Sequence, residues 1–342
     1  MESFTKAILY FIILGLKSSE VHDQFTINID GEIHDFKTTL GSNEILILTS
    51  VLAQNKKFLI VDIFSNNQLR DFAPKTERSG SLKHEYAVYK SLRVQNKQHR
   101  ATSLFRYGAV DGYRALVMSL MGPALEELFI YCGRKFSLKT ILLLADQMLD
   151  RLQTIHDAGY VHGNLTPDSF VMGVNENCCK VYLINMKYAS KFLKIRGQSR
   201  KHIPYMEQME FYGSHTFASI NRHLGTVASR RDDLESFMYI MLYFLRGKLP
   251  WQIHEDSGRY KDVLEMKLSI SLEVLCRGLP AEFVMAMSYC RSMKFAEIPD
   301  YIFLRRLFRN LFKVNAYKED WKFDWMLQYI GNMNSRKRRK LL

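Results

Sequence analysis

The sequence predicts an α+β protein in which a small strand-rich part precedes a larger helical part. Within residues 25–64, Phe25, Ile27 and Ile29 alternate with polar neighbours, a period typical of strands. From residue 138 onward, the apolar residues recur at helical spacing instead. No internal repeat and no low-complexity linker separates the two parts, which favours two lobes built from one continuous chain.

Further elements follow from the same patterns. In the strand-rich part, strands are predicted over residues 44–51, 57–64 and 115–120, and a helix over residues 82–94. In the helical part, Ser137 is a candidate N-cap for a long helix over residues 138–156. Other helices are predicted over residues 232–245, 260–270, 280–293 and 301–313.

The composition indicates a globular chain with a basic surface. Hydrophobic residues make up 47% of the 342 residues and charged residues 24%, which excludes a disordered chain. The net charge of +13 suits an acidic peptide, nucleic acid or an anionic membrane, although weak non-specific attraction is the simpler interpretation. A basic run at residues 336–340 indicates a nuclear address, a phosphate-binding tail or a solvated terminus. We expect a monomer.

The cysteines and the first residues bear on the cellular compartment. The five cysteines are irregularly spaced, which fits neither a disulfide framework nor a zinc site, so reduced thiols in a cytoplasmic or nuclear protein are expected. Residues 7–16 form an apolar stretch with the length of a signal-peptide core, too short to span a membrane. A signal or anchor, a packed helix and a misassigned start all stay open, and a secretory route with them.

Several segments, in the same order, resemble the casein kinase 1 family of protein kinases. Residues 121–148 resemble the hinge and the start of the large lobe, and residues 160–170 the catalytic loop. Residues 229–236 (SRRDDLES) resemble a signature of a large C-lobe helix, and residues 249–252 (LPWQ) follow at the expected distance.

The resemblance covers about residues 25–328 and implies a two-lobed protein-kinase fold. The small β-rich N-lobe would span residues 25–121 and the helical C-lobe residues 122–328. Residues 1–24 would then be an apolar N-terminal segment, a candidate signal or anchor, and residues 329–342 a basic tail that contacts nucleic acid or another anionic surface.

The same resemblance implies that the groups needed for phosphoryl transfer are replaced. Protein kinases use a strand lysine paired to a helix glutamate, a catalytic aspartate with a nearby lysine, and an asparagine and an aspartate that hold Mg²⁺. In this chain those positions are, in the same order, Asp62, Glu85, Asn164, Thr166, Ser169 and Asn185. Only Gly41 remains of the glycine-rich loop, and Glu44 adds a charge that repels phosphate.

These replacements predict the loss of catalysis. A neutral amide at Asn164 cannot accept a proton at neutral pH, and Asp62 would repel both the phosphates and Glu85. For Glu85, a solvated helix residue is the alternative. We therefore expect no intact catalytic residue, no metal site, and weak or absent binding of ATP and Mg²⁺.

Other features of the family are retained. Asp233 matches a helix aspartate that anchors the catalytic loop. An apolar adenine slot would be formed by Met118, Ser119, Leu120 and Met121, unless side chains fill it. Candidates for anion or peptide docking are His215, Arg230 and Arg231, of which His215 stands for a family arginine and would titrate near neutrality. Ordinary structural or solvated basic residues are the alternative.

The sequence therefore predicts a casein kinase 1-like pseudokinase that acts as a scaffold or regulator and binds a phosphorylated or acidic protein. A Ser/Thr protein kinase with residual activity is one alternative. A secreted or membrane-tethered binding protein, based on residues 7–16, is another.

Overall fold

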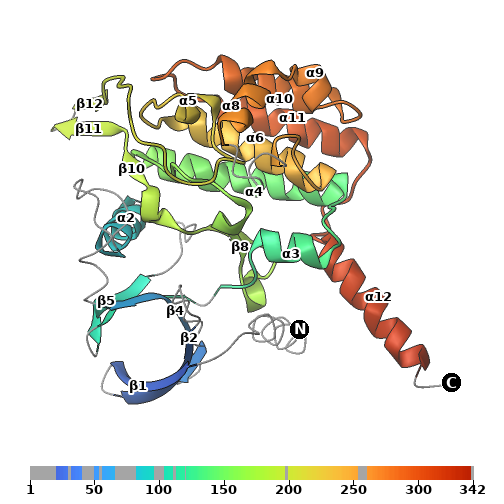
Figure 1. The fold of residues 1–342 in the computed structure, drawn as a ribbon. Helices are drawn as coiled ribbons and strands as arrows, with labels where there is room; N and C mark the ends of the chain where they lie inside the picture. Colours follow the sequence, from blue (N-terminus) through green and yellow to red (C-terminus); the bar gives the residue numbers. More distant parts are fainter. Residues whose placement is uncertain are drawn as a thin grey trace. The chain divides into compact units, whose positions relative to one another are not determined.

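The structure is a computed structural model that describes residues 21–29, 32–40, 50–53, 56–65, 82–95, 104–110, 113–119, 121–196, 199–252 and 260–339. These residues combine helices with short antiparallel strands, which confirms the α+β prediction (Figure 1). The chain divides into two units. Unit 1 comprises the described residues within Met1–Pro123 and Val171–Tyr188, and unit 2 those within Ala124–Phe170 and Ala189–Leu342.

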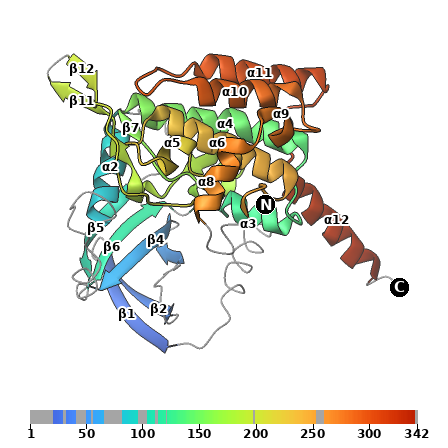
Figure 2. The same ribbon diagram turned by 45° about the horizontal axis from the view of Figure 1, so that its top comes forward.

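Unit 1 is built on an antiparallel sheet with the strand order β3-β4-β6-β5. Its strands are β3 (Ser50–Ala53), β4 (Lys56–Ser65), β5 (Leu104–Val110) and β6 (Tyr113–Ser119). Helix α2 (Leu82–Gln95) lies against β5, where Tyr86 stacks on Tyr107 at 5.1 Å between ring centroids (Figure 2). Two further strand pairs are present. β1 (Val21–Ile29) pairs antiparallel with β2 (Glu32–Leu40), and β8 (Phe170–Met172) pairs with β9 (Val181–Leu183).

The core of unit 1 follows from two sequence periods. On α2 the buried residues are Glu85, Val88, Tyr89 and Leu92, which recur at helical spacing and form one stripe. On β6 the buried Leu116 and Met118 are two residues apart and therefore share one face of the strand. Burial of a glutamate within this stripe is unusual.

Unit 2 is a layered set of helices (Figures 1 and 2). Helix α4 (Leu138–Asp157) packs on α6 (Arg230–Arg246) and on α11 (Tyr301–Val314). Helix α10 (Ala281–Ser292) lies beside α6 and α11. The Ser137 side chain caps α4 by accepting a hydrogen bond from Thr140 N at 3.3 Å, as predicted. Helix α6 is buried almost all round, as expected of a central helix.

Shorter elements complete unit 2. The helices are α3 (Leu125–Tyr131), α5 (Ile220–His223), α8 (Tyr260–Ser269), α9 (Leu272–Leu275) and α12 (Asp324–Arg339). Strand β7 (Tyr160–Val161) pairs with β10 (Ser190–Lys191), and β11 (Leu193–Arg196) pairs with β12 (Ser199–His202). Among the described residues, no helix has both the length and the apolar character that a membrane span requires.

Most predicted elements are present. The first strand begins at Val21, four residues before the predicted start of the strand-rich part. Helix α12 runs through Arg339, so the first part of the predicted basic tail is helical. No proline interrupts the helix, and the lone Gly331 is tolerated within it. The apolar stretch at residues 7–16 lies outside the described residues.

Candidate functional site

The segment at residues 162–169 is held in unit 2 by the carboxylate of Asp233. Asp233 Oδ2 accepts hydrogen bonds from His162 N at 2.7 Å and His156 Nε2 at 2.8 Å, and Oδ1 accepts one from Gly163 N at 2.9 Å. Burial alone would raise the pKa of Asp233, but these donors outweigh it and lower the pKa. His156 also contacts Tyr301 OH through Nδ1. The expected contact between Asp233 and the loop backbone is therefore present.

Asn164 uses its side-chain amide to hold a distant loop. Its Oδ1 accepts a hydrogen bond from Ser214 N at 3.0 Å. The preceding residue, Gly213, has a φ of +95°, and a Cβ there would lie 2.3 Å from Asn164 Oδ1. Only glycine fits this close approach without strain. The position predicted to replace a catalytic base is thus occupied by a neutral acceptor whose oxygen pairs with backbone.

Thr166 and Ser169 are hydrogen-bonding partners of each other. Thr166 precedes a short 3₁₀ helix, Pro167–Ser169, and donates its backbone N–H to Ser169 Oγ at 3.1 Å. The two hydroxyls lie 3.2 Å apart, and Ser169 is buried with its Oγ 3.5 Å from Asn164 O. In the described part of the chain, no group of three His, Cys, Asp or Glu residues is arranged to hold a metal ion.

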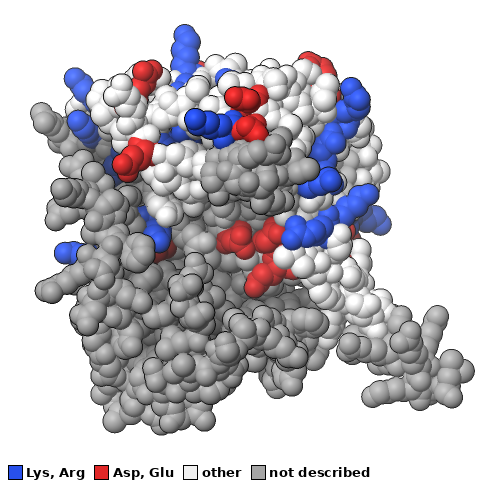
Figure 3. All heavy atoms as spheres, viewed as in Figure 1, with Lys and Arg blue, Asp and Glu red and all other residues white. Residues whose placement is uncertain are grey.

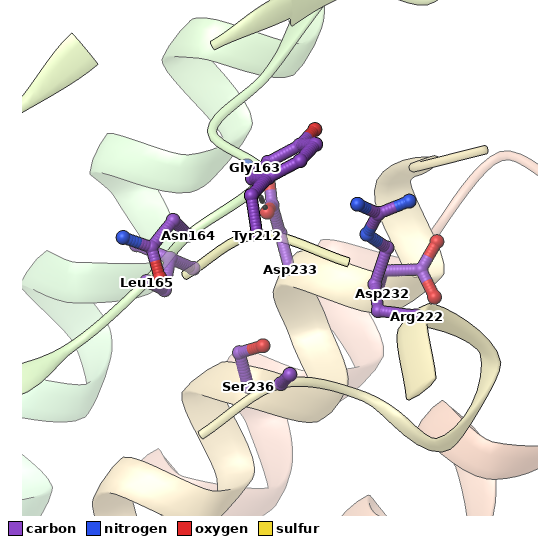
Figure 4. Close-up of a pocket in the computed structure, with 9 residues that line it drawn as sticks. Gly163, Asn164, Leu165, Tyr212, Arg222, Asp232, Asp233 and Ser236 are labelled. Carbon is purple, nitrogen blue, oxygen red and sulfur yellow. Dashed lines mark hydrogen bonds between the residues drawn. The ribbon is translucent and has the colours of Figure 1, made fainter. Parts of the chain in front are cut away.

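A small cavity lies beside this loop within unit 2. It is lined by loop residues 163–165, by Tyr212 and Arg222, and by Asp232, Asp233 and Ser236 of α6 (Figure 4). Its size is about that of one water molecule, so it does not admit a nucleotide. The guanidinium of Arg222 is buried, lies 4.6 Å from the centre of the Tyr212 ring and donates through Nη1 to Thr226 O.

In unit 1, Glu85 is buried and accepts a hydrogen bond from the backbone of Met186. Glu85 is only 5% exposed, and its Oε1 lies 2.8 Å from Met186 N. The pKa of the neighbouring Tyr89 is raised, first by burial and then by the charge of Glu85. The alternative that Glu85 is a solvated helix residue is therefore wrong: its carboxylate holds the segment that follows β9.

The other candidate positions of unit 1 are Asp62 and the segment around Asn185. Asp62 lies in β4 where the pairing with β6 shifts register between Val61 and Phe64. Asn185 is exposed and has a φ of +64°, a left-handed conformation that asparagine tolerates better than most residues. Met186 is buried, and Lys187 Nζ lies 5.6 Å from the centre of the Tyr188 ring. Gly41 and Glu44 lie outside the described residues.

The predicted adenine slot is only partly described. Met118 is buried on β6, whereas Ser119 and Met121 are half-buried, and Leu120 lies outside the described residues. The next residues pair with β8: Gly122 N donates to Met172 O at 2.7 Å, and Met172 N donates to Pro123 O at 3.0 Å. A Cβ on Gly122 would lie 2.8 Å from Gly173 O, so this pairing depends on the glycine.

The three candidates for anion docking contact different neighbours. Arg230 is buried over the Phe192 ring at 4.6 Å and donates to Ala296 O at 2.8 Å, while Arg231 donates to Met293 O at 3.4 Å. His215 instead stacks on Phe211 at 4.0 Å. The pKa of His215 is lowered, first by burial and then by the charge of Lys267. Each of the two arginines therefore has a contact with a backbone carbonyl of unit 2, and the docking role of the three residues stays a prediction.

Sequence reasoning missed the buried Lys267. Its Nζ donates to His215 O at 2.7 Å and to Ala218 O at 2.7 Å, and it lies 3.1 Å from His223 Nε2. The rings of Tyr239 and Trp251 lie 4.9 Å and 5.1 Å from the ammonium. One signal was available: Lys267 is four residues after the buried Val263 and therefore shares the inward face of α8.

No protein-family model matches the chain.

Proposed function

We propose that this chain is a casein kinase 1-like pseudokinase: a two-lobed kinase-type fold that lacks phosphotransfer activity and acts as a protein-binding scaffold or regulator. In this proposal unit 1 corresponds to the N-lobe and unit 2 to the C-lobe. The order of the motifs, the strand-rich first third and the Asp233 contact with the loop backbone support it.

The observation that carries the proposal is the structural hydrogen bond of the Asn164 side chain. A general base must accept a proton from the substrate hydroxyl, which a neutral amide cannot do. Here the amide oxygen is also paired with Ser214 N, and Gly213 packs against it. The residue therefore has a structural partner that accounts for it, and catalysis is not needed to explain its place.

Two other positions support the same conclusion. Ser169 is buried and pairs with Thr166, so its hydroxyl serves the loop. Glu85 pairs with Met186 N where an active kinase would pair this glutamate with a lysine. Loss of several members of one catalytic unit removes activity by orders of magnitude.

We further propose a cytoplasmic or nuclear protein whose partner is an acidic or phosphorylated protein bound by the C-lobe. The net charge of +13 supports an acidic partner. Because Arg230 and Arg231 are tied to the loop at residues 293–296, they are poor candidates for its direct contacts.

Phosphate incorporation into an acidic, casein-like peptide tests the proposal. The wild-type chain with Mg²⁺ and labelled ATP is expected to give no more signal than a heat-inactivated sample. The restored variant Asp62→Lys, Asn164→Asp, Thr166→Lys, Ser169→Asn and Asn185→Asp is the positive comparison. Incorporation by the wild-type chain that requires Mg²⁺ and is lost in Asn164→Ala would overturn the proposal.

A further inference from the structure

The β11–β12 ribbon of unit 2 is anchored firmly at its base. Phe192, which precedes β11, is fully buried with Val161 and Ala228, and Leu193 and Ile203 pack against this cluster. Backbone hydrogen bonds run from Phe192 N to Gly159 O at 3.0 Å and from Ile203 N to Phe192 O at 2.9 Å. The strands therefore leave the body of unit 2 from a fixed base.

The ribbon itself is basic and exposed. Residues 191–202 contain five Lys or Arg and no Asp or Glu. Lys191, Lys194, Arg200 and Lys201 are all exposed, and none of them forms an ion pair with a described residue. Viewed as in Figure 1, Lys and Arg side chains lie at the edge of unit 2 where the ribbon is placed (Figure 3).

Two lysines face each other across the ribbon. Lys194 pairs directly with Lys201 in the antiparallel register, so both side chains lie on one face. Directly opposed side chains in such a pair are about 4.5–5.5 Å apart at Cβ, and like charges in this position are destabilising. The fold thus keeps an unfavourable pair of positive charges that no described carboxylate neutralises.

We propose that this face of the β11–β12 ribbon is a contact surface for the phosphodiester backbone of a nucleic acid, with Lys194 and Lys201 each binding a phosphate. A polyanion relieves the repulsion between the two ammonium groups and releases counterions on binding. A two-stranded ribbon also fits the major groove of duplex DNA, which is about 12 Å wide. This surface goes beyond the proposed pseudokinase function and does not depend on it.

The chemistry favours a phosphate backbone over a phosphorylated peptide. Single phosphoamino acids are read by arginine clusters, whose planar groups bind phosphate in a bidentate manner. The facing pair here consists of two exposed lysines, which act as hydrated point charges. Such groups suit a repeated, sequence-independent anion.

The test is duplex binding as a function of salt, with the full chain and a fluorescein-labelled DNA duplex of about two helical turns. Between about 50 mM and 200 mM salt, log K falls linearly with log[salt], with a slope of about −0.9 for each phosphate neutralised. Lys194→Gln/Lys201→Gln is expected to make the slope shallower by about 2. Lys194→Arg/Lys201→Arg keeps both charges and is expected to retain the wild-type slope.

A matched control separates the ribbon from net charge. Lys313→Gln/Lys318→Gln removes the same charge from two exposed lysines at and beyond the end of α11, and it is expected to leave the slope near wild type. If Lys194→Gln/Lys201→Gln and Lys313→Gln/Lys318→Gln give the same slope, the proposal is overturned, whether both slopes differ from the wild type or neither does. If Lys194→Gln/Lys201→Gln weakens binding to a polyglutamate of the same charge as much as binding to the duplex, the nucleic-acid assignment is overturned. The ribbon variant is expected to unfold at the wild-type temperature or slightly above it, because the repulsion is removed.

Discussion

Asn164 and Ser214 are joined by a hydrogen bond from Ser214 N to Asn164 Oδ1 at 3.0 Å, although fifty residues separate them in the chain. The bond ties the loop after β7 to the segment before α5. The neutral amide of Asn164 therefore has a structural role, because its oxygen already accepts a hydrogen bond from a backbone N–H group. The adjacent Gly213 completes this contact, since it brings the backbone against the amide.

Gly213→Ala is expected to destabilise the chain by about 1–3 kcal/mol. Its φ of +95° disfavours a side chain, and the new Cβ would lie 2.3 Å from Asn164 Oδ1. Urea unfolding measures the effect. The double variant with Asn164→Ala should lose less than the sum of the two single variants, because truncation removes the clashing atom. Strict additivity would contradict the close contact.

Glu85→Ala is expected to destabilise unit 1 by about 1–3 kcal/mol, because Met186 N would lose its acceptor in a buried place. Glu85→Gln keeps an acceptor oxygen and should cost less. Amide hydrogen exchange at Met186 gives a local measurement: protection should fall in the alanine variant and persist largely in the glutamine variant. Equal protection in both variants would show that the carboxylate does not hold this amide.

Asp232 predicts a specific pH dependence of stability. Burial, only partly offset by bonds from Ser219 and Ser229, raises its pKa from the ordinary value of 3.8 to about 6. A carboxyl with a raised folded pKa adds stability below its unfolded pKa, and this stability is lost as pH rises through the folded value. The contribution should therefore fall between about pH 4 and pH 6, by on the order of 2–3 kcal/mol.

Asp232→Asn removes that titration. Urea unfolding of the wild type and the variant across this pH range should show the variant gaining relative to the wild type as pH rises. Asp300→Asn is a control. Asp300 caps the start of α11 by accepting a hydrogen bond from Phe303 N at 2.8 Å, and it is not among the hydrogen-bond partners of Asp232, which are Ser219 and Ser229. A constant difference between wild type and Asp232→Asn from pH 4 to pH 7 would refute the raised pKa.

Lys267→Met is expected to raise the pKa of His223. Burial first, and then the charge of Lys267, lowers this pKa to about 3. Methionine removes the charge while keeping a long apolar stem beneath Tyr239 and Trp251. An NMR titration of the His223 ring measures the shift directly. An unchanged pKa, in a variant whose thermal unfolding remains cooperative, would mean that the ammonium does not sit beside the ring as described.

How far the fold can be predicted depends on the strength of each local signal. Helix α4 begins at the expected residue because Ser137 caps it and its apolar residues recur at helical spacing. Strand β4 is equally plain from its β-branched and aromatic run. By contrast, α12 has a mostly polar sequence with a glycine inside it, so neither periodicity nor caps distinguish it from a solvated tail.

The residues of the site are predictable from the sequence, whereas most of their contacts are not. The family resemblance points to Asn164, Thr166 and Ser169, and it also indicates the contact of Asp233 with the loop. The bond from Ser214, the burial of Glu85 and the cage around Lys267 are tertiary contacts between segments far apart in the chain. For Arg230 and Arg231, the adjacent basic pair predicts docking, and the structure adds contacts with the Phe192 ring and with the carbonyls of Ala296 and Met293.

A thermal-unfolding titration with Mg-ATP, run with and without EDTA, tests the proposed loss of nucleotide and metal binding. A nucleotide that binds the folded chain stabilises it by about 2.7 kcal/mol at 100 times its Kd. The wild type is expected to show no rise in Tm that EDTA reverses. A saturable rise in Tm that requires Mg²⁺ and that EDTA abolishes would contradict this expectation.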